Sequence, residues 1–287
     1  MLRAQLIRSA TWSFKFLCLW GLVLTQEVSA QAAEGDKPWY RISAQAELGA
    51  LAVLSHKVQF GENGTYFNYV RQGGQDNLFF VSRFSAELNI SQRHSVVFLY
   101  QPLELATRAQ LDRELRVDEA RFPEGSGVNF RYGFPFYRVS YLYDVLADER
   151  RELAFGVSAQ IRNATIEFEE VGGTRFKSYR NIGFVPLLKA RGSYTWPSGE
   201  FLGFEVDGIY APIQGANGSD NEITGALLDA SIRAGVTWLD RSRLFVNLRY
   251  IAGGSTGQGD PEAFTDGYAK NWLHAMTLSL GAEISGP

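Results

Sequence analysis

The chain is nearly free of cysteine: of its 287 residues, only Cys18 is one. Residues 31–287 therefore offer no thiol, disulfide or cysteine metal ligand, which suits a protein exported through an oxidising compartment. A basic excess is also missing. The whole chain has 28 basic and 31 acidic residues, and residues 1–30 hold three of the basic and one of the acidic ones. Residues 31–287 therefore have 25 basic and 30 acidic residues, a net charge of −5. This balance, without a basic stripe, excludes a nucleic-acid binder.

Long apolar runs are the third absence. After residue 30, no stretch is continuously apolar for the roughly 20 residues that a membrane-spanning helix needs. Because only helices and closed barrels satisfy their backbone in lipid, such a chain crosses a membrane as a barrel or not at all.

The N-terminus has the three parts of a secretory signal. A basic region precedes a short apolar core, Phe16–Leu24, and Val28–Ala30 forms a small-residue cleavage site. We expect residues 1–30 to be removed and residues 31–39 to form a short periplasmic segment before a barrel of residues 40–285. A retained membrane anchor is the less favoured alternative, because the apolar core is too short to span a bilayer.

Apolar and polar residues alternate from Tyr40 to Ser55, where every even position is apolar or aromatic. A period of two indicates a strand with one apolar face. The pattern recurs and predicts ten strands, at residues 40–55, 78–91, 95–108, 128–146, 151–168, 176–196, 201–212, 223–238, 243–253 and 269–285.

The connections between these strands also alternate in length. Tight turns are predicted at 91–94, 147–150, 197–199 and 239–242, and long loops at 56–77, 109–127, 169–175, 213–222 and 254–268. Two girdles of aromatic residues are expected at the strand ends, made by Tyr40, Trp196, Trp238, Tyr210, Tyr250 and Trp272.

Two changes of phase interrupt the pattern. The apolar positions are even before Pro135 and odd after it, and a similar change occurs near Asn163. We interpret each as one inserted residue, as in a β-bulge. We expect Pro102, Pro186 and Pro212 to interrupt strands as well. A barrel of eight or twelve strands therefore remains an alternative.

Together these features predict an all-β protein, an antiparallel up-and-down transmembrane β-barrel of about ten strands. A soluble β-sandwich is the alternative, but its strands average about five to six residues, shorter than these. The predicted apolar faces are long enough to cross a bilayer, which takes about nine to eleven residues.

The polar face of these strands is rich in charge, and a barrel of this size is narrow enough for side chains to fill. The charged residues expected to face the lumen are Arg41, Glu47, Arg83, Glu87, Arg162, Lys189, Arg191, Glu205, Asp207, Asp229, Arg233, Arg249 and Glu283.

The register of one hairpin predicts specific pairs. If residues 197–199 form a three-residue loop, Arg191 lies opposite Glu205 and Lys189 opposite Asp207. Barrel closure brings Arg41 near Glu283. We favour a lumen plugged by paired charges, because buried charges must be paired; the alternative is a selectivity-setting row in a narrow pore.

Signals for catalysis are weak. His56 and His94 are expected at strand or turn ends and His274 on the lipid face, none with a positioned partner. The acidic loop segment Asp260–Asp266 lacks calcium-loop spacing. We expect no metal site and no cofactor.

The layout of alternating strands, turns, loops and girdles resembles the bacterial outer-membrane β-barrel proteins. That resemblance implies a Gram-negative outer-membrane location, periplasmic termini, and contact with outer-membrane lipids, lipopolysaccharide and the assembly machinery. The chain ends in Glu283–Pro287 rather than in the family's usual terminal aromatic residue. Ten strands is also the count of the omptin surface proteases, whose aspartate pairs and His–Asp dyad have no counterpart that we can place here.

The leading functional prediction is a non-enzymatic barrel, either a narrow porin-like pore or a charge-plugged structural or binding barrel. The alternatives are a membrane-embedded enzyme, lipid-modifying or omptin-like, with His274 or Asp266 at its rim, and an adhesin or receptor acting through loops 56–77 and 109–127. The sequence gives no oligomeric state.

Overall fold

The computed structural model describes residues 39–212, 223–238, 242–258 and 266–286. In these residues no helix has the length and apolar character needed to cross a membrane. The elements, in chain order, are β1 (Tyr40–Phe60), β2 (Phe67–Asn68), α1 (Tyr69–Gln72), β3 (Leu78–Ile90), β4 (His94–Gln101), β5 (Glu104–Gln110), β6 (Leu115–Val117), β7 (Ala120–Phe122), β8 (Gly127–Gly133), β9 (Phe136–Asp144), β10 (Arg151–Glu170), β11 (Phe176–Thr195), β12 (Glu200–Pro212), β13 (Ile223–Trp238), β14 (Ser242–Gln258) and β15 (Tyr268–Ser285).

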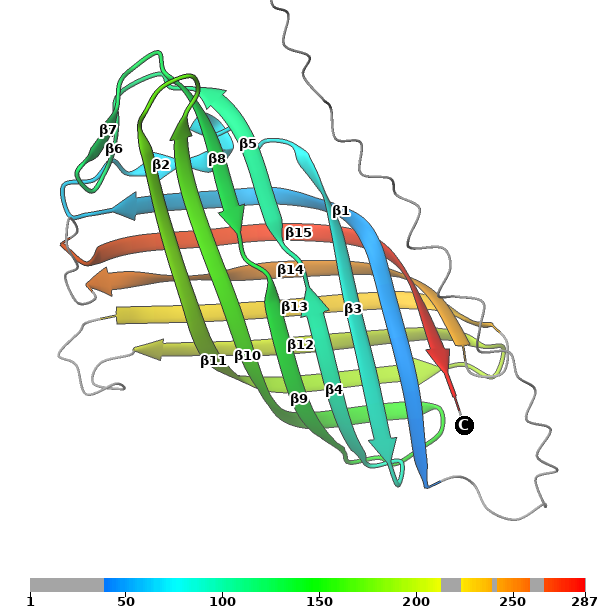
Figure 1. The fold of residues 1–287 in the computed structure, drawn as a ribbon. Coiled ribbons are helices and arrows are strands. Elements are labelled where there is room, and N and C mark those ends of the chain that lie inside the picture. Colours follow the sequence, from blue (N-terminus) through cyan, green and yellow to red (C-terminus); the bar gives the residue numbers. More distant parts are fainter. Residues whose placement is uncertain (1–38, 213–222, 239–241, 259–265, 287) are drawn as a thin grey trace, which may run out of the picture. The chain divides into compact units, whose positions relative to one another are not determined.

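The strands form a closed antiparallel barrel that is ten strands around (Figure 1). We call each of these ten positions in the wall a stave, whether one strand or two successive strands occupy it. Two staves are interrupted, since β4 continues as β5 and β8 continues as β9. The last strand, β15, pairs with β1 along most of its length and closes the barrel. The predicted fold and strand number are confirmed.

The two ends of the barrel differ in their connections. One end, which we call the turn end, carries the short connections between β3 and β4, β9 and β10, and β11 and β12. The other, the loop end, carries segments 61–77 and 111–126, and the hairpin that follows Glu170. Residues 213–222, 239–241 and 259–265, parts of three predicted connections, lie outside the described residues.

Two predicted loops are shorter than expected. Residues 254–258 belong to β14, and the connection between β10 and β11 spans only residues 171–175. Tyr250, expected at a strand end, lies inside its strand because β14 continues to Gln258.

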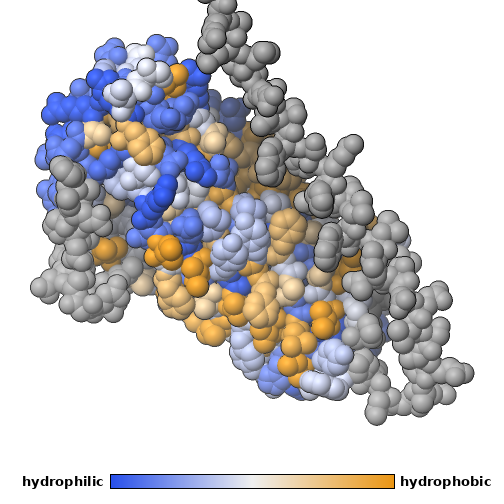
Figure 2. Space-filling view, in the orientation of Figure 1, coloured by the Kyte–Doolittle hydropathy of each residue, from blue (hydrophilic) through white to orange (hydrophobic). Residues whose placement is uncertain are grey.

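The outward face of the barrel is a broad apolar belt (Figure 2). Phe80, Ile182, Leu188 and Tyr210 each leave more than 70% of their side chain exposed. Apolar side chains at this density on a surface are stable only against another apolar phase. The alternation read from the sequence thus has its apolar face outward over this belt.

The two predicted bulges are wrong. Thr165 pairs with Gly133 and Arg162 with Phe136, so β10 keeps one register across Pro135 and Asn163. What changes is the environment: near the loop end the interior becomes apolar and the outward positions become polar. The bulge recorded in the described pairings lies in β1, between Val53 and Ser55.

Prolines have unequal effects on the staves. Pro102 and Pro135 fall in the breaks between β4 and β5 and between β8 and β9, as expected for residues without an N–H donor. Pro186 does not interrupt β11, where it lies opposite Ala159. It lies where β11 no longer pairs with β12, whose pairing begins at Leu188.

Near the loop end the barrel wall divides into two sheets (Figure 1). β3 pairs with β4 only from Phe84 to Ile90, and β5 pairs only with β8. A second division separates the loop-end half of β11 from β12. The sheet of β5, β8, β10 and β11 thus faces the sheet of β12 to β15, β1 and β3 across an apolar core.

Candidate functional site

The barrel interior is the candidate site, and it has two layers. The layer toward the middle and the turn end is charged, and the layer toward the loop end is apolar. Of the predicted lumen residues, Arg41 is exposed and Arg162 lies over the Phe134 ring, apart from the others. The remaining eleven are buried or half-buried.

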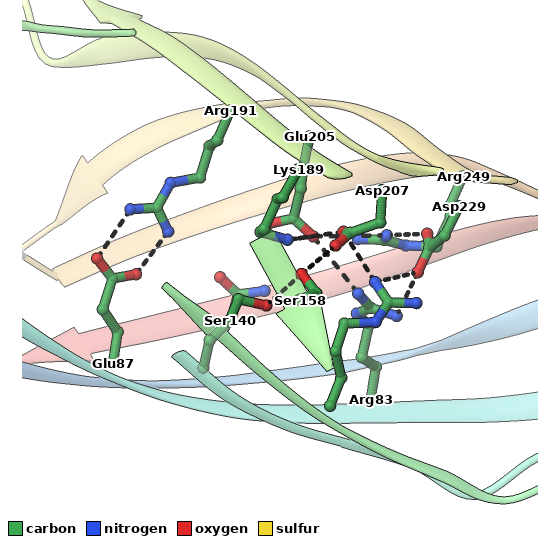
Figure 3. Close-up of polar contacts among 12 residues, drawn as sticks. Arg83, Glu87, Ser140, Ser158, Lys189, Arg191, Glu205, Asp207, Asp229 and Arg249 are labelled. Carbon is green, nitrogen blue, oxygen red and sulfur yellow. Dashed lines mark hydrogen bonds and ion pairs between the residues drawn. The ribbon is translucent and has the colours of Figure 1, made fainter. Parts of the chain in front are cut away.

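Eight charged side chains meet across the lumen, and we call them the central charge layer. Figure 3 labels Arg83, Lys189, Glu205, Asp207, Asp229 and Arg249 among them. Its members are Arg83, Arg138, Lys189, Arg249, Glu47, Glu205, Asp207 and Asp229. None has a side chain more than 15% exposed. Four cations face four anions, so the layer is neutral and every charge has a partner, as buried charges require.

The register prediction for the β11–β12 hairpin is confirmed. Lys189 lies opposite Asp207, and its Nζ is 2.7 Å from the carboxylate. Arg191 lies opposite Glu205 but forms its ion pairs elsewhere. The expected proximity of Arg41 and Glu283 is not what the pairing gives, because Gln45 is opposite Glu283.

Arg138 is the one member of the central charge layer that sequence reasoning missed. Asp207 and Asp229 are directly opposite each other on β12 and β13, which alone would be repulsive. Arg138 reaches across the lumen from β9, with its Nη1 2.8 Å from Asp207 and 3.0 Å from Asp229. Its position between the outward residues Tyr137 and Val139 is the signal that would have found it.

A second cluster lies nearer the turn end, around Arg191. Its guanidinium donates to both oxygens of Glu87, at 2.6 and 2.8 Å, and contacts Glu152 at 2.6 Å. Arg191 and Glu87 stand apart from the central charge layer in Figure 3. Such bidentate pairs are among the stronger hydrogen bonds in proteins.

A small cavity lies between the two clusters. It offers about 40 Å³ to the centres of water molecules and is lined by Ser43, Ser85, Glu87, Lys189, Arg233 and Glu283 among others. One water needs about 10–15 Å³ by this measure, so the cavity has room for only a few.

Hydroxyl groups complete the polar packing. Ser158 donates to Asp207 at 2.7 Å and lies 2.8 Å from the Ser140 hydroxyl. With the ion pairs, these contacts fix the rotamers of the central charge layer rather than leaving side chains free to swing aside.

Toward the loop end the interior is an apolar core. Side chains from both facing sheets and from the loops are buried there, among them Leu51, Phe60, Phe67, Leu105, Leu115, Phe122, Phe130, Ile166 and Phe168. The predicted receptor loops therefore turn their apolar side chains inward: Phe67 and Tyr69 from segment 61–77, and Leu115, Val117 and Phe122 from segment 111–126.

His56 lies inside this core, which corrects its predicted place at a strand end on the surface. Its side chain is fully buried, with Nδ1 2.7 Å from Gln75 Oε1 and Nε2 3.3 Å from Asn271 Oδ1. The ring stacks on Tyr69 at 4.5 Å. Burial raises the pKa of the Tyr69 phenol well above its usual range, so the hydroxyl keeps its proton.

The other two histidines lie outside the core. His94 contacts the Tyr141 hydroxyl at the turn end, and His274 contacts the Tyr250 hydroxyl on the outward face. In the described ranges, no group of three or more His, Cys, Asp and Glu side chains is arranged to hold a metal ion.

Comparison with known proteins supports the fold. The outer-membrane protease OmpT from Escherichia coli is similar at a TM-score of 0.56 with 12% identity, over 86% of this chain and 97% of that one. Weaker similarity links the chain to a Pseudomonas aeruginosa FadL homologue, at a TM-score of 0.37 and 10% identity over 86% and 90%. Ail of Yersinia pestis is similar at a TM-score of 0.30 with 10% identity, over 85% of this chain and 99% of that one.

No family model matches the sequence, and no curated protein matches it. The solved structures that match are bacterial outer-membrane β-barrels. The chain therefore has the fold of the bacterial outer-membrane β-barrel proteins, and its outward apolar belt is the surface that such a fold turns to lipid.

Proposed function

We propose that the protein is a non-enzymatic outer-membrane barrel with a closed lumen, acting as a structural or binding barrel rather than as a pore. The observation that carries this is the pair of stacked layers: a neutral, fully paired charge layer, followed by an apolar core. An ion entering the lumen would have to break paired charges and then cross apolar side chains.

The rest of the proposal concerns placement in the envelope. Residues 1–30 are removed on export, the turn end with both barrel termini faces the periplasm, and the loop end faces outward. The amide of Gly286 bonds to Ile42 O at the turn end, so the first and last strands end together there. Lipopolysaccharide surrounds the outer part of the belt, and the general assembly machinery inserts the barrel.

Conductance of refolded residues 31–287 in a planar lipid bilayer tests the closed lumen. We expect no reproducible current steps from the natural sequence. Glu205→Gln and Asp207→Asn keep side-chain volume while removing charge, and we expect these variants to be silent as well. Steps in the natural protein whose ion selectivity changes in either variant would establish a pore and overturn the proposal.

A further inference from the structure

The division of the wall between β3 and β5 is a seam in the described part of the barrel. Residues Leu78–Arg83 of β3 have one strand neighbour, β1, and β5 has one, β8. On the outward side of this seam, Leu78 and Phe80 are 73% and 75% exposed. An unpaired stretch of wall beside lipid-facing side chains is costly in a membrane unless something covers it.

One segment of the chain, Tyr69–Gln75, lies against β5 and leads into β3 at Leu78, and we call it the wedge. The Thr107 hydroxyl of β5 donates to Gly73 O at 2.5 Å. Gly74 has a φ of +73°, and a Cβ built on it lies 3.9 Å from the Ala109 Cβ. The wedge thus rests on β5 through side-chain and van der Waals contacts, where an ordinary barrel has a ladder of backbone hydrogen bonds.

The interior behind the wedge is apolar, unlike the rest of the lumen. Val81, Leu103 and Leu105 are at most 5% exposed and line the seam from both sides. This surface suits an alkyl chain, whereas the charge layer below it does not.

Two buried hydrogen-bond donors in the wedge have no partner among the described residues, the Tyr69 hydroxyl and the Gln75 side-chain amide nitrogen. Both side chains are fully buried. Burying an unsatisfied donor costs about 1–3 kcal/mol, so each such group calls for an explanation, and a ligand that accepts from both donors is one. Two donors beside an apolar surface match an oxygen-bearing head group on an apolar tail.

We propose that the β3–β5 seam admits a single-chain amphiphile of the fatty-acid type from the outer leaflet into the apolar core, with the wedge as its door. The tail packs between Val81 and Leu105, and the head group accepts from Tyr69 and Gln75. The route enters from the side and ends above the central charge layer, so it leaves the lumen closed to ions.

The absence of cysteine from residues 31–287 allows a clean test. Gly74→Cys with Ala109→Cys places two Cβ atoms at a spacing that a disulfide accepts, about 3.5–4.5 Å. The oxidised double variant has its wedge fixed to β5, and a reductant releases it. The single variant Gly74→Cys controls for the strain of a side chain at positive φ.

The probe is palmitic acid carrying a diazirine on its chain, photolysed with the barrel in phosphatidylcholine nanodiscs and mapped by mass spectrometry. We expect cross-links to wedge and core residues in the natural protein, their loss in the oxidised double variant, and their return on reduction. Labelling confined to the outward belt, unchanged by the disulfide, would overturn the proposal.

A second variant separates binding from packing. If Tyr69 only packs, Tyr69→Phe removes an unsatisfied donor and leaves core labelling by the probe unchanged. If Tyr69 holds the head group, the variant reduces core labelling by the acid but leaves labelling by a diazirine-bearing alkane as it was. Unchanged labelling by both probes would contradict the assigned head-group site.

Discussion

Arg138 joins two walls of the lumen through its ion pairs. It is the group that stands between Asp207 and Asp229, two carboxylates placed opposite each other by the register of β12 and β13. A guanidinium can serve both because its planar donors stay charged at any relevant pH. The neutrality of the central charge layer therefore depends on a residue from the opposite wall.

Replacing Arg138 by Met tests this dependence. Removing one partner of a buried charge network costs about 3–5 kcal/mol, because the remaining charges are left uncompensated. We expect Arg138→Met to lower the free energy of unfolding by that amount in lipid vesicles, measured by denaturant titration. Arg41→Met, at an exposed position, is the control and should change it little. Equal effects of the two substitutions would contradict the assigned role of Arg138.

Residue-scale prediction from sequence succeeded where the partner was local. The Lys189–Asp207 contact follows from a hairpin register that three turn residues set. Arg138 and the pairing of Arg191 with Glu87 depend on strands that meet across the lumen, and His56 depends on Gln75 from a loop. No local pattern encodes those distances.

The strands themselves show why alternation has to be read together with environment. A period of two says that neighbouring side chains point to opposite faces, but it does not say which face meets water. Along β10, even positions point inward throughout: Ser158 and Gln160 are polar, whereas Ile166 and Phe168 are apolar. The exchange of apolar and polar faces looked like an inserted residue, although the strand has no bulge there.

The apolar core at the loop end makes a prediction about the elements that build it. Phe168 is fully buried among aromatic rings from β1, β8 and the loops. We expect Phe168→Ala to lower the free energy of unfolding by about 3–5 kcal/mol, the usual cost of emptying a large buried site. Phe176 on the neighbouring strand is 58% exposed, and Phe176→Ala is the matched control, expected to stay within about 0.5 kcal/mol. If the Phe168 variant were as stable as the control, the loop end would not be a packed core.

For the whole molecule, the stave number, the alternation of connections and the closure of β15 on β1 could be predicted because each rests on a pattern repeated along the entire chain. The division of the wall into two facing sheets could not be predicted. It depends on where β3 leaves β4 and where β11 leaves β12, and Pro102 and Pro186 mark these places without indicating how far the strands separate.

The central claim, a barrel closed between its two ends, is tested most directly by cysteine accessibility in cells. Ser43→Cys places a thiol in the cavity on the turn side of the charge layer, and Glu124→Cys places one on the exposed loop end. A small, charged, membrane-impermeant thiosulfonate added to intact cells should modify Glu124→Cys and spare Ser43→Cys, which should react only once the outer membrane is permeabilised. Modification of Ser43→Cys in intact cells would contradict the closed lumen or the proposed orientation, and failure of Glu124→Cys to react would contradict the orientation alone.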